Sequence, residues 1–92
     1  MDPVLLEILA NKFVAATEEM ASALQRTART LFVKEAADFA CALVGVDGRV
    51  FAHPWASGVN LFVNLDANHA IRAVPDLAPG DVIVTNDPYL SG

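Results

Sequence analysis

The stretch that decides the fold is residues 2–30, DPVLLEILANKFVAATEEMASALQRTART, which has no glycine and no proline after Pro3. Asp2 is suited to cap the free amides at a helix start, and Pro3 has the fixed φ of a first helical position. Apolar or small residues recur along the stretch at gaps of three and four: Leu5, Leu9, Phe13, Ala16, Met20, Leu24, Thr27 and Leu31. This spacing predicts one helix from about Pro3 to about Thr30.

The predicted helix is too long for the chain that contains it. It would measure about 40 Å, whereas a compact domain of this size has a radius of gyration of about 12 Å and a diameter near 30 Å. Hydrophobic residues form 54% of the 92 residues, above the roughly 45–50% of an average domain. We therefore expect that the chain self-associates or shares its core with a partner, or that residues 1–92 are a truncated part of a larger protein.

A β-hairpin is predicted after the helix. Two apolar segments, residues 39–46 and 49–53, flank the dipeptide Asp47-Gly48. Asp-Gly is typical of a two-residue type I′ turn, which requires a positive φ at both positions.

The second half of the chain alternates between loops and short elements. Residues 53–58 have loop composition, residues 59–65 alternate partly like a strand, and residues 66–74 have helical spacing that ends at Pro75. The β-branched run at 82–84 predicts a further strand, buried on both faces. The fold class expected is α+β: a long N-terminal helix, a hairpin, a second short helix and a further strand, within a larger α/β body.

Polar residues follow that last predicted strand. Thr85, Asn86 and Asp87 come next, and Pro88 restricts Asp87 to extended backbone at a loop entrance. A carboxylate placed there is a candidate functional group. The alternative is that Asn86-Asp87-Pro88 forms only an Asx-type turn.

Composition argues against several classes of function. The net charge is −5 and six Lys and Arg are spread along the chain, so binding to nucleic acid or to anionic membranes is disfavoured. No apolar run reaches the length of a spanning helix, and the acidic start is unlike a signal peptide, so we expect a cytoplasmic protein. Four residues that could carry chemistry are assigned none. Cys41 is interpreted as a small buried hydrophobe and Trp55 as a packing anchor. His53 is interpreted as a surface or hydrogen-bonded residue, and His69 as a solvent-facing or helix-packing one.

Three motifs resemble the hydantoinase B/oxoprolinase family. The sequence from Gly80 to Tyr89, GDVIVTNDPY, is similar to a family signature. Arg26-Thr-Ala followed by Lys34-Glu-x-x-Asp-Phe-Ala-Cys-Ala42 is similar to the end of the family's long N-terminal helix. Val46-Asp-Gly-Arg-Val50 matches a family turn. Asn60 stands where many members carry a histidine, and this departure from the family pattern bears on the substrate class.

The resemblance implies the amino-terminal portion of a B-type component of an ATP-dependent cyclic-amide hydrolase. The family includes the B subunit of N-methylhydantoinase, the corresponding half of 5-oxoprolinase and a large subunit of acetone carboxylases. It implies a hydantoinase A-type partner that uses ATP, a small-molecule substrate and a divalent metal ion. Asp87 would then be a metal ligand, completed by a His-x-x-Asp element after Gly92, and Asn86 would orient it or bind a substrate carbonyl. No catalytic residue is assigned, and residues 1–92 alone are expected to be inactive.

Two other functions remain open at this point. One is a subunit of an ATP-dependent ketone carboxylase of the same family. The other is a non-enzymatic α+β interaction module whose long helix pairs with another chain. A reading frame that continues with His-x-x-Asp would favour the enzyme, and a stop codon after Gly92 would favour the module.

Overall fold

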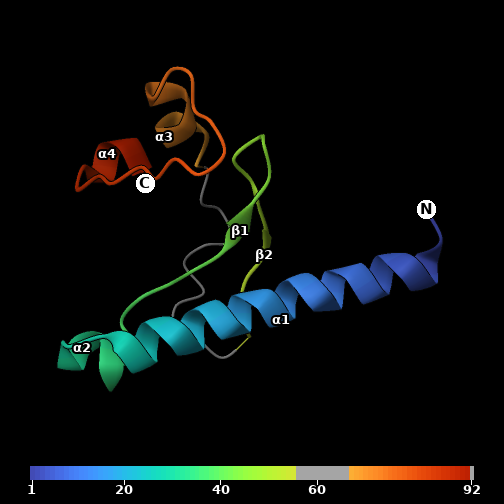
Figure 1. Cartoon of the computed structure of the whole chain (residues 1–92), viewed down its shortest axis with the longest axis horizontal. Helices are drawn as coiled ribbons and strands as arrows, with labels where there is room; N and C mark the ends of the chain where they lie inside the picture. Colours follow the sequence, from blue (N-terminus) through green and yellow to red (C-terminus); the bar gives the residue numbers. More distant parts are fainter. Residues whose placement is uncertain (56–66, 92) are drawn as a thin grey trace.

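A single long helix supports the rest of the chain. The computed structural model describes residues 1–55 and 67–91 (Figure 1). Helix α1 spans Pro3–Thr27, and Asp2 caps it by accepting a 2.9 Å hydrogen bond from the amide of Val4. The predicted helix is confirmed, including its Asp-Pro start, and it ends three residues earlier than expected.

A short second helix, α2 (Leu31–Lys34), folds back beside the end of α1 (Figure 1). Its N-cap is Thr30, whose hydroxyl accepts from the amide of Phe32, and Gln25 on α1 donates to the carbonyl of Lys34 at 3.0 Å. Ala37, just after α2, has a φ of 52°. This is the left-handed conformation that commonly ends a helix and that usually carries glycine.

The predicted hairpin is present, with a different turn. Strands β1 (Leu43–Val44) and β2 (Val50–Ala52) pair antiparallel. Gly45 donates to the carbonyl of Arg49, Gly48 donates to the carbonyl of Gly45, and only Gly48 of the turn has a positive φ, at 81°. The loop therefore has three residues, Val46 to Gly48, which is the geometry of a type I turn closed by a left-handed glycine. The expected type I′ turn, with a positive φ at Asp47, is wrong.

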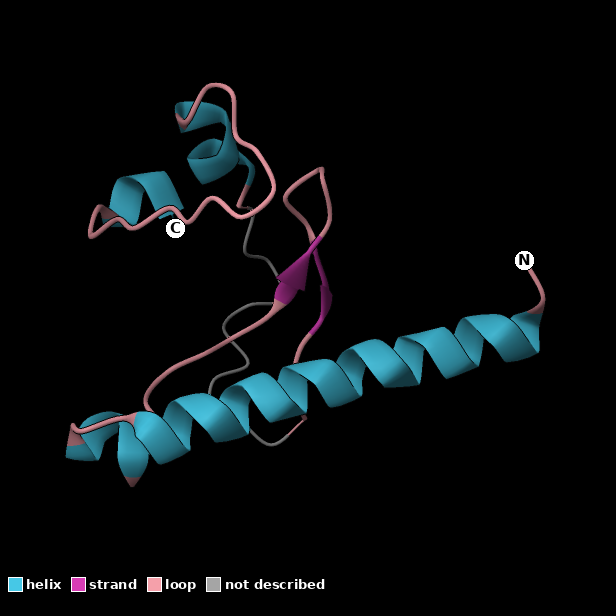
Figure 2. Cartoon of the chain, in the orientation of Figure 1, coloured by secondary structure: helices cyan, strands magenta, loops and turns pink. Residues whose placement is uncertain are grey.

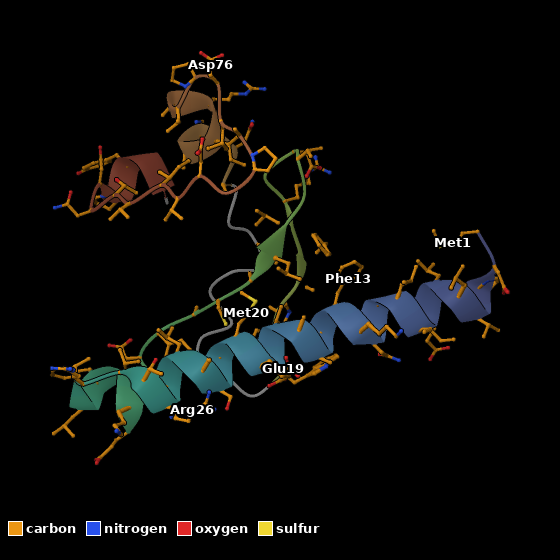
Figure 3. The ribbon with its side chains drawn as sticks, viewed as in Figure 1. Met1, Phe13, Glu19, Met20, Arg26 and Asp76 are labelled. Carbon is orange, nitrogen blue, oxygen red and sulfur yellow. The ribbon has the colours of Figure 1, made fainter. Side chains whose placement is uncertain are left out.

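A β-bulge directs the hairpin onto α1. Leu43 faces Ala52 and Val44 faces Val50, so Phe51 is the extra residue on β2. Its ring meets that of Phe13 on α1 edge-on, with centroids 5.2 Å apart, and Figure 3 shows Phe13 on the hairpin side of the helix. Beneath the contact lie small buried residues, Thr17 and Ala21 on α1 and Ala52 on β2. This small core fixes the hairpin to the middle of α1.

The last third of the described chain lies at the far side of the hairpin from α1 (Figure 2). Helix α3 covers Asn68–Ala73, close to the prediction, and the short helix α4 covers Pro88–Ser91. Residues 82–84 form no ladder here, and Val82 and Val84 are 84% and 90% exposed. The further strand is thus absent within the described residues, because β-branched residues favour a strand only where a neighbouring strand supplies hydrogen bonds. The strand predicted at 59–65 lies outside the described residues, as does Asn60.

The molecule is less compact than a typical folded chain of the same length. Its radius of gyration is 14.5 Å, against about 12 Å for a compact chain of 92 residues. Helix α1, about 37 Å long at 1.5 Å per residue, nearly equals the longest dimension of 42 Å. Its N-terminal third extends beyond the hairpin (Figure 1), and Val4, Leu6 and Ile8 are exposed there. The expected overhang is confirmed.

Candidate functional site

Asp87 begins a helix in this structure. One of its carboxylate oxygens, Oδ1, accepts a 2.9 Å hydrogen bond from the amide of Tyr89, and Pro88 occupies the first position of α4. Asp2 and Pro3 make the same arrangement at the start of α1. Asp87 therefore does locally what the turn interpretation predicted, since an Asp before Pro at a helix start satisfies an otherwise unpaired amide.

The backbone of Asp87 makes a second local hydrogen bond, to the side chain of Thr85. The hydroxyl of Thr85 accepts a 3.1 Å hydrogen bond from the amide of Asp87. Thr85, Asn86 and Asp87 are all exposed, so the carboxylate and the amide side chain are at the surface where a ligand could reach them. The predicted site residues, Asn86 and Asp87, thus lie together on one exposed turn between residues 81–84 and α4.

A second turn, at residues 78–81, precedes the apolar run 82–84. Asp81 accepts a hydrogen bond from the amide of Ala78 through Oδ2 at 2.9 Å and donates its own amide to the carbonyl of Ala78 at 3.0 Å. Gly80, within that turn, has a φ of 92°. The run at 82–84, in which Val82 and Val84 are exposed and Ile83 is half-buried, is therefore bounded by two turns, each built around an aspartate.

The histidines lie elsewhere and have ordinary surroundings. His53 is half-buried, with Nδ1 3.1 Å from the carbonyl oxygen of Pro54 and its ring 6.4 Å from that of Trp55. His69 is exposed on α3. His53 thus lies as a hydrogen-bonded residue and His69 as a solvent-facing one, in agreement with both predictions.

Cys41 has the properties of an unreactive thiol. It is half-buried rather than fully buried as predicted, and its Sγ donates to the carbonyl of Thr17 on α1 at 3.7 Å. Burial raises the pKa of this thiol above its ordinary value, and the nearby negative charge of Glu18 raises it further. A raised pKa lowers the fraction of nucleophilic thiolate at neutral pH, so Cys41 is suited to packing.

Sequence reasoning missed one contact that positions the loop after β2. The amide of Trp55 donates to Oε1 of Glu18 on α1 at 2.6 Å, and the Trp55 side chain is 81% exposed. The two residues are 37 positions apart, and no local pattern connects them. The prediction that Trp55 is a packing anchor is therefore wrong for the described part of the chain. A hydrogen bond holds the backbone of Trp55, and its side chain is exposed.

The described residues do not by themselves form a metal site. Across residues 1–55 and 67–91 no three His, Cys, Asp or Glu side chains are grouped so as to hold an ion. Within the same ranges no helix is both long enough and apolar enough to cross a membrane. At the candidate site, the structure supplies Asp87 as one oxygen donor, with Asn86 beside it.

Comparison with known proteins finds one family that matches nearly the whole chain. The family model described as Hydantoinase B/oxoprolinase matches residues 2–92. The 5-oxoprolinase of Saccharomyces cerevisiae is 33% identical over 94 residues, covering 100% of this chain. The 5-oxoprolinase 1 of Arabidopsis thaliana is 35% identical over 96 residues, covering 99% of it. An uncharacterized protein of Methanocaldococcus jannaschii is 30% identical over 101 residues and also matches the full chain.

The matched region is a small part of these relatives. The chain spans 7% of the yeast and plant proteins and 17% of the archaeal one. No solved structure gives a significant match.

Proposed function

Because the chain belongs to the hydantoinase B/oxoprolinase family, we propose that it forms part of the B-type component of an ATP-dependent hydrolase that opens a cyclic amide. The observation that supports 5-oxoproline over hydantoins is the name of the relatives: proteins called 5-oxoprolinase from a yeast and a plant match nearly all of the chain at 33% and 35% identity. Residues 1–92 would be the amino-terminal portion of that component and would be inactive alone.

In this proposal the turn at Asn86 and Asp87 faces the substrate or a bound ion in the complete enzyme. An ionised carboxylate is a hard oxygen ligand for a divalent cation. Capping α4 does not preclude that role, because a carboxylate has about four lone-pair positions and can accept more than one bond. Asn86 would orient the carboxylate or donate a hydrogen bond to a substrate carbonyl.

The metal itself would need ligands beyond the residues described here. A single carboxylate does not fix a divalent ion, which takes six or more oxygen ligands in the case of Ca²⁺ and an octahedral set in the case of Mg²⁺. The proposal therefore assigns no chemical step to a metal. What these residues contribute is a start of α4 held by two local hydrogen bonds, with the Asp87 carboxylate at the surface.

The complete protein would act with a hydantoinase A-type subunit or domain that uses ATP to activate the carbonyl oxygen by phosphorylation. Hydrolysis of a stable five-membered lactam needs such activation, because the amide carbonyl is a poor electrophile. We propose a cytoplasmic location.

The competing proposal is a subunit of a ketone carboxylase from the same family. The two are separated by an assay of the complete protein with its A-type partner, in which ATP turnover is measured against 5-oxoproline, hydantoins and ketones with bicarbonate. Turnover that depends on 5-oxoproline supports the proposal, and turnover that depends on a ketone and bicarbonate supports the carboxylase. If none of these substrates stimulates ATP turnover, both enzymes are rejected in favour of an interaction module.

A further inference from the structure

One face of α1 is apolar, regular and exposed beside the hairpin. Residues in positions a and d of a heptad repeat run along it for three heptads: Leu6, Leu9, Phe13, Ala16, Met20, Ala23 and Thr27. We call this face the α1 seam. The hairpin covers the neighbouring side of the helix, where Thr17 and Ala21 are buried, and leaves Phe13 and Met20 of the seam 43% and 39% exposed.

From this pattern we propose that the α1 seam binds the α1 seam of a second copy of the chain, in antiparallel orientation. Apolar residues fill these a and d positions from Leu6 to Ala23, and Thr27 follows them; such a pattern is typical of helices that pair. In an antiparallel pair centred near residues 14 and 15, Phe13 would face Ala16 of the other copy and Leu9 would face its Met20. Large side chains would then meet smaller or flexible ones, which allows close packing.

Charge supports a second copy as the occupant. Lys12 and Glu19 are seven residues apart, so both flank the seam on the same side, away from the hairpin, and both are exposed. Figure 3 shows Glu19 on the opposite side of α1 from the hairpin. In the antiparallel pair, Lys12 of each copy would lie beside Glu19 of the other, which gives two complementary contacts related by the two-fold axis. A parallel pair would instead place Lys12 near the uncharged Thr17.

The hairpin would extend the same interface. Phe51 is 55% exposed although it contacts Phe13, so its outer edge continues the apolar surface of the seam. This places apolar area from two elements on one face. The inference concerns assembly and stands apart from the proposed enzymatic function.

Reversing the charge of Lys12 or Glu19 tests the pairing without disturbing an ion pair inside the helix. The residues three and four positions from Lys12 and from Glu19 on α1 are all uncharged, so changing either charge disturbs no pair within the helix. Sedimentation equilibrium of the 92-residue chain over a range of concentrations measures the dimer dissociation constant. Lys12→Glu and Glu19→Lys should each raise that constant about tenfold, because two attractive contacts become repulsive.

The decisive experiment is to restore dimerisation by combining the two charge reversals. The double variant Lys12→Glu, Glu19→Lys should dimerise like the parent chain, and an equimolar mixture of the two single variants should form mixed dimers. Glu7→Lys, which changes the charge outside the seam and also has uncharged helical neighbours, is the matched control and should leave the constant unchanged. A monomeric parent chain overturns the inference. So does a dimer whose strength is insensitive to Lys12 and Glu19, or one that the mixture fails to restore.

Discussion

Gly48 lies directly against the first residue of α3, so that a Cβ built on Gly48 would be 2.4 Å from the backbone nitrogen of Asn68. The carbonyl of Gly48 also accepts a 2.9 Å hydrogen bond from the amide of Ala67. The turn of the hairpin therefore carries the start of α3, and glycine is required there for two separate reasons, its positive φ and the closeness of a backbone.

Replacing Gly48 with alanine should destabilise the chain by about 2–4 kcal/mol, as the sum of backbone strain and a clash with backbone that cannot turn aside. Gly80→Ala is the matched comparison, because Gly80 also has a positive φ but has no atom within 4 Å of the added Cβ. That variant should lose only about 1 kcal/mol, from strain alone. Urea denaturation of both measures the difference, and equal losses would show that the Asn68 contact is unimportant.

Replacing Ala37 with glycine should stabilise the chain. Alanine at a φ of 52° costs about 1–2 kcal/mol, and glycine removes that cost while adding about 0.4–1 kcal/mol of unfolded-state entropy. The expected gain is up to about 1 kcal/mol in the free energy of unfolding. Ala36→Gly, one residue earlier at an ordinary φ, should be destabilising; a gain from both variants would contradict the assignment of strain to Ala37.

Cys41 should react slowly with thiol reagents. Burial and the charge of Glu18 both raise the pKa of its thiol, so the thiolate fraction at pH 8 is lower than in a free cysteine. The rate of reaction with a chromogenic disulfide should rise on going to Glu18→Gln, which removes the charge and keeps an oxygen for the Trp55 amide, and should not change in Glu19→Gln. Unfolding in urea should restore the ordinary rate, and a folded chain that already reacts at that rate would refute the predicted shift.

Asp87→Asn in the complete parent protein should lower metal content and turnover together. Asparagine caps a helix about as well as aspartate, so the bond from the Tyr89 amide should survive and the melting temperature of the metal-free protein should barely move. Asp81→Asn removes the same charge from the neighbouring turn and is the control, with unchanged metal and rate expected. Normal metal content and turnover in Asp87→Asn would leave Asp87 as a helix cap only.

The sequence predicted most of the local elements but few of the contacts between elements that are distant in the chain. Helix α1 was predictable because its cap, its spacing and the absence of breakers all lie within one stretch. The position of the hairpin was predicted correctly, but its turn type was not. Both possible loops place Gly48 in a left-handed conformation, and they differ in the φ of Asp47 and in the register of the strands. The strand at 82–84 was predicted from residue type, whereas a ladder needs a partner that residue type does not supply.

The candidate site shows the same limit. Asp-Pro predicted a turn and suggested a ligand, and the structure contains the turn. A carboxylate that caps α4 and one that binds a cation have the same sequence, so the spacing of Asn86, Asp87 and Pro88 could not separate the two roles. The bond between Glu18 and the amide of Trp55 was unpredictable for another reason, because the two groups meet only after the hairpin has docked.

The contacts between α1 and the hairpin also set an order of events during folding. Helix α1 and the hairpin each form from near neighbours, whereas Phe13 meets Phe51 across 38 positions and Glu18 meets Trp55 across 37. Closing such a span costs loop entropy before any contact compensates for it, so local elements form in microseconds or less and distant ones later. Docking of a preformed hairpin onto a preformed helix should therefore be the rate-limiting step, and a nascent chain would complete it only after Trp55 has left the ribosome.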